Sequence, residues 1–223
     1  MMLRLSFLLA AVFSGGVGAF TTRSNMNNAA SLLQLNLFPP RQPIMAGNWK
    51  MNPATEADAL NLANGFCALL NELEDTCAVE EVEGCTEVVI FPPYPFISKV
   101  KDIVFKNGIT VGAQQVYYEN KGAFTGSVAA SMVKSVGCEY VLCGHSERRS
   151  LFSDNDVNIN LKVRKVLEFG MKPILCVGET QDEYDLGITQ EVCAMQVSKD
   201  LAGVSEKDMA NVVIAYEPVW AIG

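Results

Sequence analysis

Short apolar segments alternate with longer amphipathic segments from residue 44 to the end of the sequence. The apolar runs lie at residues 44–50, 86–91, 109–114, 140–143, 172–177 and 211–216. Near-continuous apolar runs of this length are typical of parallel strands that are buried on both faces. Between them apolar side chains recur every three or four residues, as at Ile159, Val163, Val166 and Leu167, which indicates helices. The pattern therefore predicts βαβ units and an α/β fold with a parallel sheet.

The residues between these segments predict where the helices begin and end. Asn52 followed by Pro53 is typical of a helix start, and Ser153 or Asp154 can cap the helix after the fourth strand. The stretch 180–201 reads as one long helix.

Polar side chains gather where the expected strands end. Asn48 and Lys50 follow the first strand and His145 follows the fourth, while Glu179 and Glu217 follow the fifth and sixth. In a (β/α) barrel the carboxyl ends of the strands form the active-site face. No GxGxxG glycine fingerprint follows the first strand, which argues against a dinucleotide-binding sheet. We therefore expect a barrel whose mouth holds these polar groups.

Lys50, His145 and Glu217 are a cation, an imidazole and a carboxylate expected at one mouth, and His145 is the only histidine of the chain. Proton transfer at a carbon next to a carbonyl needs a base, a donor that polarises the oxygen, and a positive charge. Each residue also has a structural interpretation, as a solvated lysine, a helix cap and a surface carboxylate. The sequence has no HExxH motif, no acid-rich metal cluster and no nucleophile elbow. We expect neither a metal nor another cofactor.

Composition narrows the classes of partner. With 223 residues and 49% hydrophobic content, the chain can form one domain with a large core. Its net charge of −8 argues against nucleic acid and anionic membranes as partners. The chain has seven cysteines, an odd number, and they form no CxxC motif. Buried free thiols in a reducing compartment are thus favoured over a disulfide framework or a zinc site.

Residues 1–43 differ from the rest and read as a disordered leader before a domain at 44–223. A short basic start precedes nine apolar residues at 5–13, too few to span a bilayer, and residues 17–19 fit a signal-peptidase site. The stretch 20–43 carries arginines and hydroxyl residues but no acid, as transit peptides do. Together they are similar to the bipartite presequence of proteins sent to plastids with several membranes. The alternatives are a secretory leader with a disordered linker and a mitochondrial protein.

Six short strings add a family resemblance. They are GNWKMN (47–52), PPYPF (92–96), GAFTG (122–126), GHSERR (144–149), CVGET (176–180) and AYEPVWAIG (215–223). In this order they resemble the triosephosphate isomerase family across residues 44–223. Another phosphosugar isomerase or epimerase of the same architecture is disfavoured by the set as a whole.

The resemblance implies a TIM barrel that interconverts dihydroxyacetone phosphate and D-glyceraldehyde 3-phosphate through an enediolate, without cofactor or metal. It implies Glu217 as the base and His145 as the electrophile. Lys50 would bind the substrate and stabilise the developing negative charge, with Asn48 beside it. The amide of Gly223, in the first part of a closing lid, would meet the phosphate.

The resemblance also implies a homodimer in which Thr125 and its loop reach into the partner subunit. Ser127 stands where the family usually has glutamate, which puts an ion pair near that interface in doubt. About six of the family's eight strand-helix units are expected in this sequence. We therefore expect residues 45–223 alone to form a partial barrel that is inactive and poorly stable, because its first and sixth strands would each lack a neighbour. A non-catalytic binding or structural protein is the alternative.

Overall fold

The computed structural model describes residues 7–8, 41–76 and 86–221. The expected leader therefore lies outside the described residues, except for Phe7, Leu8 and residues 41–43. Gly223 and the cysteines Cys77 and Cys85 lie outside them as well.

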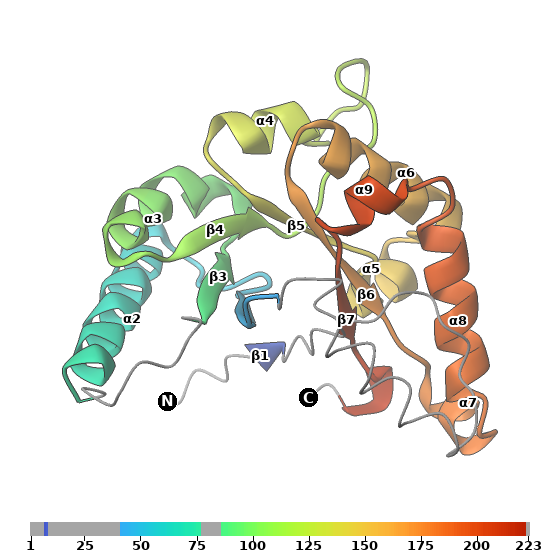
Figure 1. Ribbon diagram of the computed structural model, residues 1–223. Coiled ribbons are helices and arrows are strands. Elements are labelled where there is room, and N and C mark those ends of the chain that lie inside the picture. Colours follow the sequence, from blue (N-terminus) through green and yellow to red (C-terminus); the bar gives the residue numbers. More distant parts are fainter. Residues whose placement is uncertain (1–6, 9–40, 77–85, 222–223) are drawn as a thin grey trace.

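A curled sheet of parallel strands forms the inside of an arch (Figure 1). Within the described residues the parallel strands are β2 (Ile44–Asn48), β3 (Glu87–Phe91), β4 (Thr110–Ala113), β5 (Tyr140–Cys143), β6 (Lys172–Val177) and β7 (Val213–Tyr216). Each strand pairs with the next in chain order. This sequential, all-parallel order is the barrel topology that the alternation predicts, and all six expected strands are present.

Helices cover the outside of the arch (Figure 1). The helices that follow β2 to β6 along the outside include α2 (Glu56–Thr76), α3 (Ile97–Val104), α4 (Ala130–Ser135), α6 (Asp156–Glu168) and α8 (Thr189–Asp200). Other described helices are η2 (Tyr94–Phe96), η3 (Phe105–Asn107), α5 (Ser146–Leu151), α7 (Gln181–Asp185), α9 (Glu206–Met209) and η4 (Val219–Ala221). Among the described residues, no helix combines the length and apolar character needed to cross a membrane.

The first parallel strand has a neighbour that comes from outside residues 45–223. The two-residue strand β1 (Phe7–Leu8) pairs antiparallel with β2, placing Phe7 opposite Gly47 and Leu8 opposite Ala46. An edge strand carries unpaired N–H and C=O groups, and an extended apolar segment can satisfy them.

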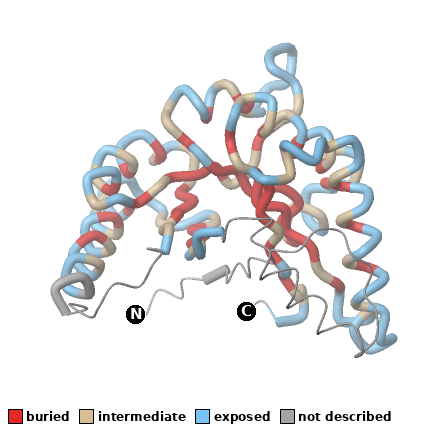
Figure 2. Tube along the Cα trace, viewed as in Figure 1, coloured by how far each residue is buried: buried red, intermediate tan, exposed pale blue. Residues whose placement is uncertain are grey.

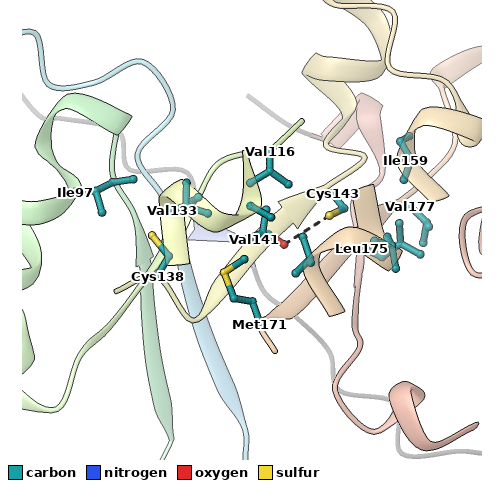
Figure 3. Close-up of a cluster of buried hydrophobic side chains, with 14 residues drawn as sticks. Ile97, Val116, Val133, Cys138, Val141, Cys143, Ile159, Met171, Leu175 and Val177 are labelled. Atoms are coloured by element: carbon teal, nitrogen blue, oxygen red, sulfur yellow. Dashed lines mark hydrogen bonds between the residues drawn. The ribbon is translucent and has the colours of Figure 1, made fainter. Parts of the chain in front are cut away.

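The core follows the two-residue period of the strands. Figure 2 shows buried residues along the inside of the arch. Tyr140 and Leu142 of β5 face the barrel interior, while Val141 and Cys143 pack against the helices. The helix-facing cluster is drawn in Figure 3, where Val141, Cys143 and Leu175 of the sheet lie near Ile159 of α6. Strands buried on both faces explain the continuous apolar runs of the sequence.

The five cysteines in the described residues are all free. Cys67, Cys138, Cys143 and Cys176 are buried and Cys193 is half-buried. Burial raises the pKa of the Cys143 thiol to about 12, so it is an apolar core group and not a reactive one. This confirms the preference for free thiols over a disulfide framework at these positions.

Three predicted helix boundaries are wrong. Helix α2 is capped by Thr55, whose hydroxyl accepts from the Asp58 N–H, and not by Asn52. Helix α6 is capped by Asn155, whose Oδ1 accepts from the Asn158 N–H. Neither Ser153 nor Asp154 caps it, and the Asp154 carboxylate is occupied by Arg148 and Lys162 instead.

The third error is the long helix expected at 180–201. It is two helices, α7 and α8, which the left-handed Gly187 (φ 71°) separates. Thr180 and Glu183 form a capping box at the start of α7, so this short helix is anchored at its own end.

Candidate active site

The junction between β5 and α5 presents the histidine. Gly144 has a left-handed backbone (φ 76°), which turns the chain sharply after the strand. His145 then caps α5, and its Nδ1 accepts a hydrogen bond from the Glu147 N–H at 3.2 Å. The interpretation of His145 as a helix cap is therefore confirmed, and the capping contact orients the ring.

The cap also decides the tautomer of the imidazole. A ring nitrogen that accepts from an N–H carries no proton, so the proton of the neutral ring is on Nε2. Nε2 lies 3.0 Å from the Glu217 carboxylate, and both side chains are buried. The imidazole therefore presents Nε2–H toward the barrel mouth as a hydrogen-bond donor.

Glu217 lies just after β7 and is 3% exposed. The backbone N–H and the hydroxyl of Ser146 donate to its carboxylate at 3.1 and 3.0 Å. Burial by itself raises the pKa of Glu217, but the hydrogen bond from His145 and the two hydrogen bonds from Ser146 outweigh this effect. The net effect holds the pKa of this carboxyl below its ordinary value, so Glu217 is ionised at neutral pH.

Lys50 lies in the turn after β2, in a left-handed conformation (φ 54°) that is uncommon for a residue with a side chain. Two polar side chains hold that turn. Asn48 Oδ1 accepts from the Lys50 N–H at 2.9 Å, and Gln114 Nε2 donates to the Lys50 carbonyl at 2.7 Å. The Lys50 ammonium lies 2.7 Å from the Glu147 carboxylate.

The structure thus brings Asn48, Lys50, His145 and Glu217 to one mouth, as the sequence predicts. Glu147 links two of them, because it pairs with Lys50 through its side chain and caps the ring of His145 through its N–H.

Two other predicted positions are elsewhere. Glu179 is fully buried, and its side-chain partners are other residues than His145 and Glu217. It accepts from Tyr216 Oη and from Trp220 Nε1, both at about 3.0 Å. Thr125 is exposed in the loop between β4 and α4, and Gly223 lies outside the described residues.

Three contributors to the site were missed from the sequence. The sequence analysis includes Ser146 and Glu147 only in the GHSERR string and Gln114 only at the end of an expected strand. The signal that could have found them is adjacency, since Gln114 ends the third apolar run and Ser146 and Glu147 are the first two residues after the histidine. The described residues contain no group of three or more His, Cys, Asp or Glu side chains placed to hold a metal ion.

Comparisons with known proteins agree with this geometry. A family model described as "Triosephosphate isomerase" matches residues 43–223. Curated proteins named triosephosphate isomerase from Prosthecochloris aestuarii and Chlorobium luteolum are 46% and 45% identical to the chain, over 183 and 185 residues. These alignments cover 82% of this chain and 68% of each relative.

A solved structure is similar as well. The crystal structure of triosephosphate isomerase from Bartonella henselae matches with a TM-score of 0.66 at 30% sequence identity. The match covers 82% of this chain and 70% of that one.

Proposed function

This chain belongs to the triosephosphate isomerase family and interconverts dihydroxyacetone phosphate and D-glyceraldehyde 3-phosphate, and we propose that Glu217, His145 and Lys50 carry the reaction. One observation supports these roles above the others. An ionised, buried carboxylate lies 3.0 Å from an imidazole Nε2, beside a lysine ammonium at the same barrel mouth. The family match favours this isomerase over a non-catalytic binding or structural protein.

Glu217 is the base that moves a proton between the two substrate carbons. Its present hydrogen bonds from Ser146 and His145 lower its basicity. Substrate must therefore draw the carboxylate away from these donors, and this exchange raises its basicity at the moment when a base is needed.

His145 polarises the substrate oxygen. Its Nε2–H is a neutral donor, since Nδ1 is occupied by the Glu147 N–H. Once Glu217 moves toward the substrate carbon, this donor is free for the carbonyl oxygen on which negative charge develops. The same imidazole can pass that proton between the two oxygens of the enediolate intermediate.

Lys50 supplies positive charge for the phosphorylated substrate and for the enediolate. The chain carries a net charge of −8, which repels a phosphate ester from most of its surface. The ammonium is paired with Glu147 and half-buried, so its position is defined before substrate arrives. No metal or cofactor takes part in these steps.

Two variants test the roles. We expect Glu217→Asp to lower kcat on the order of a hundredfold with little change in KM, because the base retreats by about one methylene. Lys50→Ala should weaken both binding and turnover. A coupled assay in both reaction directions measures these constants. Near-normal kinetics in both variants would show that the assigned roles are wrong.

The proposal extends to a homodimer that buries the loop carrying Thr125. Tyr117 stacks on Tyr118 with ring centroids 4.3 Å apart and also contacts Phe124, so an aromatic cluster stiffens this exposed loop. Met51, next to Lys50 in the sequence, is a second apolar side chain that a partner subunit would bury, because it is 92% exposed. Sedimentation equilibrium should show a dimer that Thr125→Arg weakens. An unchanged mass for that variant, or a monomeric parent chain, would refute the interface.

The proposed location is a plastid, where the reaction would serve carbon fixation; glycolysis and gluconeogenesis are the other processes that use it. The support is the composition of residues 1–43, a short apolar segment followed by a basic, acid-free one. A fluorescent reporter fused to residues 1–43 should enter plastids, and replacing Phe20 should divert it. Accumulation in the medium or in mitochondria would contradict this.

A further inference from the structure

Arg149 lies behind the site, 18% exposed in its side chain, and makes four side-chain hydrogen bonds. Two go to backbone carbonyls at the ends of neighbouring strands. Nε–H donates to the Gly144 oxygen at 2.8 Å, and Nη2–H donates to the Cys176 oxygen at 3.2 Å. Two carbonyls cannot bond to one another, so a donor between them is needed to join β5 and β6 beyond their last pair, Cys143 with Leu175.

The backbone of the same residue acts on the other side of the histidine. The Arg149 N–H donates to the His145 carbonyl at 3.1 Å. The guanidinium therefore holds the carbonyl before the His145 Cα, and the amide holds the carbonyl after it. The Arg148 N–H donates to the same His145 carbonyl at 2.8 Å, so the contact particular to Arg149 is that of its guanidinium with the Gly144 carbonyl.

Two carboxylates fix the guanidinium from behind. Nη1 lies 2.8 Å from Asp156 at the start of α6, and Nη2 lies 2.6 Å from Asp200 at the end of α8. The Asp200 side chain is fully buried. A planar fork with several donors suits this arrangement, whereas a lysine ammonium could satisfy only part of it.

The fit is close at the turn itself. A Cβ added to Gly144 would lie 2.9 Å from Arg149 Nη2, so the guanidinium packs directly against the left-handed residue that precedes the histidine. The neighbouring Arg148 shares the backbone contact, since its N–H donates to the His145 carbonyl at 2.8 Å, but its side chain differs. Its side chain pairs with Asp154 and stacks on Phe152, away from both strand ends.

We propose that Arg149 is a positioning residue for the isomerase: its guanidinium holds the peptide group that precedes His145, and it thereby sets where the Nε2–H donor points. The proposal rests on the proposed function and adds to it a residue that touches neither substrate nor reacting atoms. Loss of the Arg149 guanidinium leaves the substrate-binding groups in place but misdirects the His145 Nε2–H, which lowers kcat more than it alters KM.

Arg149→Lys and the matched control Arg148→Lys test this in the full chain, carrying a histidine-free purification tag. We expect Arg149→Lys to lower kcat on the order of tenfold to a hundredfold with KM within about threefold of the parent value. Arg148→Lys should leave kcat within about threefold, even where it lowers thermal stability as much, because its contacts lie away from the strand ends.

The single histidine provides a second measurement that does not depend on activity. The ¹⁵N and ¹H resonances of one imidazole can be assigned without ambiguity. They should shift in Arg149→Lys and stay in place in Arg148→Lys. An Arg149→Lys variant with parental kcat, or with lowered kcat but unmoved imidazole resonances, would overturn the proposal. A parent chain without isomerase activity would refute the proposed function, and the resonances would still decide the role of Arg149.

Chemical rescue separates positioning from a loss of folding. In Arg149→Ala, added methylguanidinium should restore kcat in part and saturably, while methylammonium at the same concentration should not. Equal effects of the two cations would contradict the proposal that the planar guanidinium of Arg149 positions His145. If this variant does not fold, Arg149→Lys decides alone.

Discussion

Replacing Gly178 with alanine should displace the carboxylate of Glu217, the proposed base, without changing its chemistry. Gly178 follows β6, and a Cβ added there would lie 2.0 Å from the Glu217 carbonyl oxygen and 2.6 Å from its carbonyl carbon. Real Cβ atoms essentially never come closer than 3.0 Å to such atoms, so the gap must widen by at least 3.0 − 2.0 = 1.0 Å.

The displacement falls on Glu217 because Gly178 is held on both sides. The buried Gln196 side chain accepts from the Gly178 N–H at 2.9 Å and donates to its carbonyl at 3.1 Å. Moving Glu217 away from Gly178 would also lengthen the 2.7 Å hydrogen bond from the Glu217 N–H to the Val177 carbonyl. Misplacement of a reacting group by about 1 Å can cost on the order of a hundredfold in rate.

We therefore expect Gly178→Ala to lower kcat by about a hundredfold. Overpacking should also reduce the free energy of unfolding by about 1–3 kcal/mol. The coupled isomerase assay gives kcat, and thermal unfolding by circular dichroism gives stability.

Gly170→Ala is the control for destabilisation. Gly170 is left-handed (φ 64°) at the end of α6 with open space where a Cβ would go, so alanine costs about 1–2 kcal/mol in backbone strain. It should leave kcat unchanged. If Gly178→Ala kept kcat within about threefold of the parent, the inference that this close contact locates the base would be refuted.

Three further outcomes are expected. Gly65→Ala, in an exposed and uncrowded position of α2, should stabilise the fold by about 0.5–1 kcal/mol in denaturant unfolding, and destabilisation would contradict this. Burial raises the pKa of Asp200 from 3.8 to about 6 despite the Arg149 charge, so the folded chain binds its proton more tightly and stability should fall as pH rises through this window. Asp200→Asn, which keeps an acceptor, should remove that fall in melting temperature, and an unchanged pH profile would refute the assignment. Ser146→Ala should raise the pKa of Glu217 and move the acid limb of kcat/KM to higher pH, and an unmoved limb would show that its hydroxyl bond is unimportant.

The fold class follows from local pattern. Strands such as β5 and β6 are buried on both faces, so their continuous apolar runs identify them without reference to any neighbour. The order of six parallel strands is also a local consequence, because short βαβ connections leave few other arrangements. The positions of Lys50, His145 and Glu217 after their strands predicted a shared mouth for the same reason.

Helix starts could not be read with the same accuracy, because each polar side chain had more than one partner available. Asp154 fits a cap by sequence, yet Lys162 and Arg148 take its carboxylate, and Asn155 caps α6 instead. The break at Gly187 is a similar case, since a glycine within a helical pattern does not by itself end a helix.

The sequence by itself predicted that Asn48, Lys50, His145 and Glu217 share the mouth of the barrel. Only the tertiary structure showed that Glu179 binds Tyr216 and Trp220 instead, and which other residues contribute. Ser146 and Glu147 contribute because the turn at Gly144 points one N–H at the Glu217 carboxylate and the next at the His145 ring. Arg149 matters because the carbonyls of Gly144 and Cys176, 32 positions apart in the sequence, end side by side. A local pattern records burial and periodicity, whereas hydrogen-bond partners between strands are set by the curl and register of the sheet, which no single segment encodes.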